Sequence, residues 1–302
     1  MICSLDQLVE KVLSCKKKQK IAVASAQDDN TISAIYRAVN EGFAEGILVG
    51  DLSSINETCR KKDIDPSRFS IIGTESDTEA ARLAVHLAKT GDADIIMKGL
   101  VGTDIFLRAV IDKEKGLLIP GAALAYVGAV EIPSYHKLLF LTDLAVIPFP
   151  DMNQKIQMAE YSLEIARTFG IEKPKIALVG ASEKVSPHFP NTADYAQMCK
   201  MAAEGKFGDC IMDGPLDLFL ACDKHSPEIK GVRTPVNGDA DILLFPSLES
   251  SNPFYKSLML FAGGEIAGLI RGTTKPVIVM SRSESEKSKY YCIAMSCLMA
   301  QN

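Results

Sequence analysis

The sequence lacks the features that would place the protein in a membrane or on nucleic acid. No apolar run approaches the roughly 18 residues that a bilayer span needs, and residues 1–20 look like an amphipathic helix rather than a signal peptide. A formal net charge of -5 gives no basic field for nucleic acid or anionic membrane. The eight cysteines form no C-x-x-C pair and no His-Cys cluster, which favours reduced thiols over disulfides or a zinc site. We therefore expect a cytoplasmic protein without a metal site.

What is present is ample material for large cores, because 47% of the 302 residues are hydrophobic. Strand-like and helix-like segments alternate from residue 21 to residue 98, which is typical of a parallel sheet with helices on both faces. Pro148 and Pro150 then interrupt the pattern, and a second alternating series begins at Lys175. We predict an α/β fold of two α/β/α domains with mainly parallel sheets and an active-site cleft between them. The first domain comprises residues 1–150 plus 268–302, and the second, residues 151–267, is inserted into it.

Between the two series the helical period disappears. Residues 123–132 and 137–146 are rich in apolar residues, and a short turn that contains Pro133 and His136 separates them. This pattern predicts the two strands of a hairpin.

The stretch from Lys275 to Lys289 holds the main candidate site. Residues 277–280 are apolar and predict a short buried strand, after which Ser281 and Arg282 precede a helical pattern. Anions collect at the carboxyl ends of such strands, beside helix N-termini, and arginine is a forked, permanently charged donor for phosphate. The blander interpretation makes the serine a helix cap and Arg282 a solvated charge.

Two further groups have the residue types of an anion site. Lys98 and Gly99 follow the fourth predicted strand and lead to Arg108, but the full Walker pattern is missing, so Lys98 fits a surface cation equally well. Ser250, Ser251 and Asn252 precede Pro253, which we expect at the first helical position with Asn252 as its cap. Plain capping would explain these donors as well.

Taken together, these segments resemble the phosphate acetyl/butyryltransferase family and are closest to its butyryl branch. The resemblance covers nearly the whole chain, and its motifs follow one another in the family's order. They are Thr142-Asp143 with Pro150-Asp151, residues 183–190, residues 212–216, residues 235–241, residues 246–252 and residues 279–282.

The resemblance implies reversible transfer of a butyryl or similar short or branched acyl group between coenzyme A and inorganic phosphate. It also implies a homodimer that uses coenzyme A as a substrate and needs no cofactor. Carried over by position, Ser281 would donate to the acyl carbonyl or the thiol, and Arg282 would hold phosphate. Arg108 would match a basic position of the family's first domain, and Asn252 with the two serines before it would match the turn on the phosphate side.

One position departs from the acetyl branch, which has an aspartate where this chain has Ser288. The resemblance therefore leaves the general base unassigned and favours the butyryl branch. The alternatives are a phosphate acetyltransferase and a catalytically silent protein that binds acyl-CoA or acyl phosphate. An NAD-linked or decarboxylating dehydrogenase is disfavoured because the chain has neither G-x-G-x-x-G nor an aspartate cluster suited to a divalent metal.

Overall fold

The computed structural model describes residues 1–301, and its contacts divide the chain into two compact units. The N-terminal unit consists of Leu5–Leu124 and the chain from Ile266 onward, and the central unit consists of Met1–Ser4 and Ala125–Glu265. The predicted boundary after residue 150 falls inside the central unit, because strand β6 (Leu139–Thr142) pairs in parallel with β9 (Ile242–Leu244). The predicted cleft between domains and the insertion of one domain into the other remain predictions.

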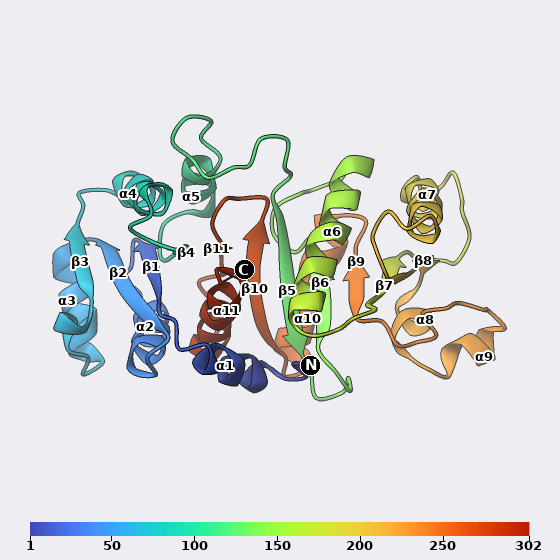
Figure 1. Ribbon diagram of the computed structural model, residues 1–302, viewed down its shortest axis with the longest axis horizontal. Coiled ribbons are helices and arrows are strands. Elements are labelled where there is room, and N and C mark those ends of the chain that lie inside the picture. The colour runs from blue at the N-terminus through green and yellow to red at the C-terminus, as the bar shows by residue number, and fades with distance from the viewer. Residues whose placement is uncertain (302) are drawn as a thin grey trace. The chain divides into compact units, whose positions relative to one another are not determined.

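The N-terminal unit has the predicted parallel sheet, with strand order β3-β2-β1-β4-β11-β10 (Figure 1). All neighbouring strands in it are parallel except β10 and β11. Strands β1 and β4 consist almost entirely of buried residues, as expected for a parallel sheet covered on both faces. The strands are β1 Gln19–Ala24, β2 Ala44–Gly50, β3 Ser70–Gly73, β4 Ile95–Lys98, β10 Glu265–Arg271 and β11 Val277–Ile278.

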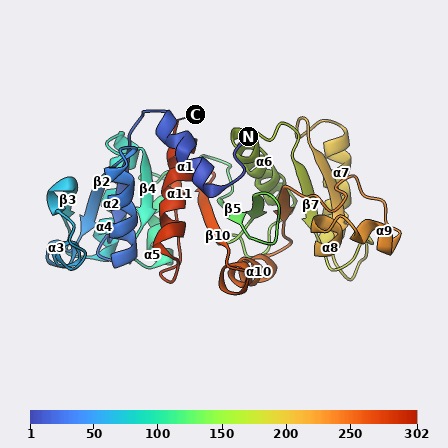
Figure 2. The ribbon, with the colours of Figure 1, turned by 90° about the horizontal axis from the view of Figure 1, so that it is seen from below.

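Side-chain caps begin several helices of this unit. Asp28, Asp51, Ser76 and Ser285 each accept a hydrogen bond from a backbone N–H of the first turn, which satisfies one of the donors that a helix start leaves open. Helix α11 packs on α1 and α2, and α4 packs on α5 (Figure 2). The helices are α1 Leu5–Ser14, α2 Asp29–Asn40, α3 Leu52–Lys61, the short 3-10 helix η1 Pro66–Arg68, α4 Asp77–Thr90, α5 Thr103–Val110 and α11 Glu286–Met299.

The central unit has the strand order β5-β6-β9-β7-β8. Strand β5 (Ala125–Glu131) is antiparallel to β6, which confirms the predicted hairpin, and the remaining pairs are parallel. Asp151 caps α6 in a full capping box with Gln154. No helix within residues 1–301 is both long and apolar enough to cross a membrane. The other elements are α6 Met152–Thr168, β7 Lys175–Val179, α7 Asn191–Ala203, β8 Ile211–Leu216, α8 Leu218–Cys222, α9 Ser226–Lys230 and α10 Leu248–Phe261.

Candidate active site

Ser281 and Arg282 lie in an exposed turn between β11 and α11, which agrees with their predicted place at the end of a strand. The strand is shorter than expected, and the helix starts at Glu286 because Ser285 takes the cap position. Within the turn, the Ser283 N–H donates to Ser281 Oγ over 3.3 Å, and the Glu284 N–H donates to the Ser281 carbonyl over 3.2 Å. These bonds give the turn a defined shape.

The turn is tied to the end of β4. Arg282 Nη2 donates to the Leu100 carbonyl over 2.6 Å, although 182 residues separate the two in the chain. The parallel pairing of β11 with β4 sets Ile278 opposite Met97. The segments that follow these two strands therefore leave the sheet at the same edge. The carboxyl ends of parallel strands are where α/β proteins bind anions. The structure therefore brings two of the predicted groups, Lys98-Gly99 and Ser281-Arg282, to one place.

Lys98 is not the surface cation that its sequence context also allowed. Its side chain is almost fully buried, and Nζ donates to the carbonyls of Gly99 and Val101 over 3.1 and 3.2 Å. The Leu100 carbonyl that accepts from Arg282 lies between these two in the sequence. Three consecutive carbonyls thus hold an amine and a guanidinium side by side.

Gly99 makes this arrangement possible because β1 passes very close to it. A Cβ at this position would lie 2.2 Å from the Ser25 carbonyl oxygen and 2.8 Å from that of Ala24. The Gly99 N–H donates to the same Ala24 oxygen over 2.8 Å. The glycine is therefore required by the close approach of two backbones.

Gly99→Ala should lower the free energy of unfolding by about 3 kcal/mol, because the added methyl group must push the ends of β1 and β4 apart. Urea unfolding measures the loss. Gly42→Ala is the matched control: its methyl group would meet nothing within 4 Å and only the φ of 88° is unfavourable, which costs about 1 kcal/mol. Equal losses for the two variants would contradict the steric explanation.

Four charged or hydroxyl side chains around Lys98 were not among the predicted site residues. Lys289 is buried and donates to Asp28 Oδ1 over 2.9 Å, and Ser25 Oγ donates to Asp77 Oδ1 over 2.6 Å. The two aspartates were expected only to begin helices, since an aspartate before an apolar periodic run is a typical helix start. The position of Ser25, Asp28 and Asp77 after predicted strands was the signal that pointed to the site, whereas Lys289 lies within α11 and had no such signal.

The surroundings of Lys98 lower its pKa. Burial lowers the pKa of Lys98, and the positive charges of Arg282 and Lys289 lower it further. Asp28 and Asp77 act in the opposite direction, but the net shift of this pKa is downward.

Ser288, at the position that departs from the acetyl branch, is buried in the N-terminal unit. Its hydroxyl accepts from the Ile266 N–H over 3.2 Å, and its own N–H donates to the cap Ser285 over 2.9 Å. These contacts join the start of α11 to β10.

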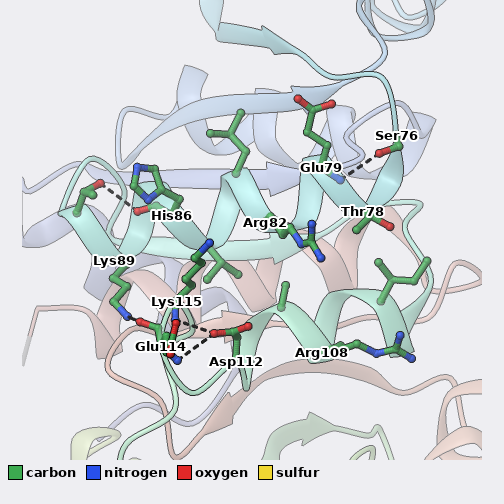
Figure 3. Close-up of a pocket in the computed structure, with 15 residues that line it drawn as sticks. Ser76, Thr78, Glu79, Arg82, His86, Lys89, Arg108, Asp112, Glu114 and Lys115 are labelled. Carbon is green, nitrogen blue, oxygen red and sulfur yellow. Dashed lines mark hydrogen bonds between the residues drawn. The ribbon is translucent and has the colours of Figure 1, made fainter.

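Arg108 is separate from the pair formed by Lys98 and Arg282. It lies in the last turn of α5 with its side chain 81% exposed, 4.0 Å from Asp104. Figure 3 shows it with Arg82 of α4 among the residues that line an open pocket of about 1190 Å³. Neither Lys98 nor Arg282 lines this pocket. The role of Arg108 in substrate binding remains a prediction.

In the central unit, the predicted start of a helix at Pro253 is wrong. Helix α10 begins at Leu248 with Ser247 in the extended cap conformation, and Pro253 lies inside the helix. The local preference of proline for the first turn was overridden by an earlier start, so Ser250, Ser251 and Asn252 are helical residues and Asn252 is no cap.

Two of these side chains are engaged with the loop after β6. The buried Ser251 hydroxyl donates to the Asp143 carbonyl over 2.5 Å, and Asn252 Nδ2 donates to the Leu144 carbonyl over 2.9 Å. Ser250 Oγ donates to the Ser247 carbonyl over 2.8 Å within the helix. The predicted binding of substrate by these residues is untested, whereas their hydrogen bonds fix the loop to α10.

The fold and the cationic turn define an α/β protein with a lysine and an arginine at the carboxyl edge of a parallel sheet. The chain belongs to the phosphate acetyl/butaryl transferase family, whose model matches residues 3–84 and 74–297. This confirms the resemblance that the sequence motifs indicated.

Individual relatives match over the full length. A phosphate butyryltransferase from Clostridium acetobutylicum is 39% identical over 302 residues, which is 100% of both chains. A phosphate acetyltransferase from Thermotoga maritima is 36% identical and covers 98% of this chain and 99% of its own. The crystal structure of a branched-chain phosphotransacylase from Enterococcus faecalis V583 matches with a TM-score of 0.81 and 27% identity, over 94% of this chain and 99% of that one.

Proposed function

We propose that this protein transfers an acyl group reversibly between coenzyme A and inorganic phosphate, so that acyl-CoA and phosphate give acyl phosphate and coenzyme A. The observation that carries the proposal is the 39% identity with a phosphate butyryltransferase across the whole of both chains. We further propose a butyryl or similar short or branched acyl group. Support for this comes from the names of similar proteins, which include a second phosphate butyryltransferase at 37% identity and the branched-chain phosphotransacylase.

The chemistry requires mainly placement and charge. A thioester and an acyl phosphate are both activated acyl donors, so holding the nucleophile against the carbonyl and stabilising the developing negative charge supplies much of the acceleration. In the proposal the Ser281 hydroxyl donates to the acyl carbonyl oxygen, and Arg282 holds the phosphate. We propose direct displacement in a ternary complex, without a metal ion, a prosthetic group or an acyl-cysteine intermediate.

Thiol release tests this function directly. Protein mixed with butyryl-CoA and phosphate should release free coenzyme A, and the rate should persist after dialysis against a chelator. Tight binding of butyryl-CoA without release would instead support the silent binding protein. A panel of acetyl-, propionyl-, butyryl- and branched acyl-CoA identifies the preferred chain, and a strong preference for acetyl-CoA would reassign the protein to the acetyl branch.

We also propose that the protein works as a cytoplasmic homodimer. In support of self-association, Leu260 and Phe261 at the end of α10 are 75% and 81% exposed although both are apolar. Light scattering on a size-exclusion column should give twice the mass of 32.7 kDa. A monomer at micromolar concentration would contradict the dimer.

A further inference from the structure

The hydrogen bonds of Lys98 match those of a neutral amine. Its Nζ has two acceptors within residues 1–301, the carbonyls of Gly99 and Val101. An ammonium has three N–H donors and no lone pair, whereas a neutral amine has two donors and one lone pair. With both donors of the neutral form bound to carbonyls, the lone pair of the nitrogen remains for a proton.

The surrounding charges come from several elements packed around this amine. Arg282 precedes α11 and Lys289 lies within it, while Asp28 caps α2 and Asp77 begins α4. Each carboxylate is already engaged, Asp28 by Lys289 and Asp77 by Ser25. Burial, and after it the positive charges of Arg282 and Lys289, lower the pKa of Lys98.

Acyl transfer to coenzyme A requires a group that takes the thiol proton. The hydroxyl of Ser288 is buried against the backbone N–H of Ile266. A hydroxyl in that environment does not serve as a base. The amine of Lys98 lies beside the Arg282 guanidinium because consecutive carbonyls hold both groups.

We propose that Lys98 is the proton acceptor and donor for the coenzyme A thiol. Its amine takes the proton of the S–H bond as sulfur bonds to the acyl carbon, and the bond from that carbon to the phosphate oxygen breaks. The ammonium then passes this proton to the departing phosphate oxygen, so that phosphate leaves as the hydrogen phosphate dianion beside Arg282 and the amine is restored. In the reverse direction, the amine takes the proton of the attacking phosphate, the carbon–sulfur bond breaks, and the ammonium gives the proton to sulfur. This inference rests on the proposed function and adds a catalytic role for Lys98.

Two substitutions in the full-length protein separate proton transfer from simple charge. Lys98→Met removes both the charge and the proton, whereas Lys98→Arg keeps the charge but holds its proton at all working pH values. Both should lower kcat by about 10²- to 10⁴-fold, the usual contribution of general acid–base catalysis. The KM for phosphate should change only a few-fold. In a third variant, Lys98→Ala, added ethylamine should take the place of the missing amine and restore part of kcat. Lys61→Met, at an exposed helical position of the same unit, is the matched control and should match wild type.

A Lys98→Arg variant with near wild-type kcat would overturn the proposal, because the residue would then act only as a cation. If the variants do not fold, labelling of the wild-type protein with acetic anhydride across pH, read by mass spectrometry, gives the titration midpoint of each lysine. The midpoint for Lys98 should lie below that for Lys61, and equal midpoints would also overturn the proposal. Failure of the wild-type protein to release thiol from butyryl-CoA would refute the proposed function, while the titration of Lys98 is measured independently of that activity.

Discussion

Replacing Arg282 with alanine should lower kcat/KM for phosphate by about 10²- to 10³-fold, as expected when a donor to the charged substrate is lost. The guanidinium is the forked, permanently charged group of the turn, and its hydrogen bond to the Leu100 carbonyl holds it beside the end of β4. The side chain is exposed, so the free energy of unfolding should change by less than about 1 kcal/mol. The measurement combines steady-state kinetics with urea unfolding of the same preparation.

Two further variants sharpen the interpretation of Arg282. Arg282→Lys keeps a point charge but not the planar fork, so it should recover only part of the lost rate. Arg60→Ala removes an exposed arginine at the end of α3 in the same unit and should leave the kinetics unchanged. Near-normal turnover in Arg282→Ala would refute the role in phosphate binding and leave the turn as a solvated connection.

Asp143→Asn should have the largest effect on stability, about 2–6 kcal/mol, because two buried backbone N–H groups lose their acceptor and each unsatisfied group costs roughly 1–3 kcal/mol. The Asp143 carboxylate is only 3% exposed. It accepts the backbone N–H groups of Tyr126, Ala145, Val146 and Ile147. An amide presents a donor where two of these N–H groups now find an oxygen, so buried donors would be left without acceptors.

Urea unfolding of Asp143→Asn measures this loss, and Asp151→Asn provides the matched control. Asp151 is an exposed helix cap, and because asparagine caps as well as aspartate, the change there should stay within about 0.5 kcal/mol. Because Ser251 and Asn252 hold the same loop, Asp143→Asn should also disturb the start of α10. A loss below about 1 kcal/mol would show that the four N–H groups find other acceptors.

The local pattern of the sequence determined much of the fold. The hairpin of β5 and β6 and the strand–turn–helix around Ser281 were predicted because alternation and helical period act over a few residues. The same reasoning was wrong about α10, where Ser247 and not Asn252 begins the helix. Ser247 lies five residues before Asn252, and the start of the helix there accompanies tertiary packing in which the buried Ser251 hydroxyl binds the loop after β6.

Residue types and motif order were therefore sufficient to identify the family, the α/β class and the pair Ser281 and Arg282. Only the tertiary structure brought Lys98 beside Arg282 and paired Asp28 with Lys289, which stand 261 residues apart. The physical reason is that the strand order sets which chain ends meet at the edge of a sheet, and this order depends on long-range pairing that no local pattern records. Burial and neighbouring charges then make Lys98 an amine with a lowered pKa, a property that its position in the sequence does not contain.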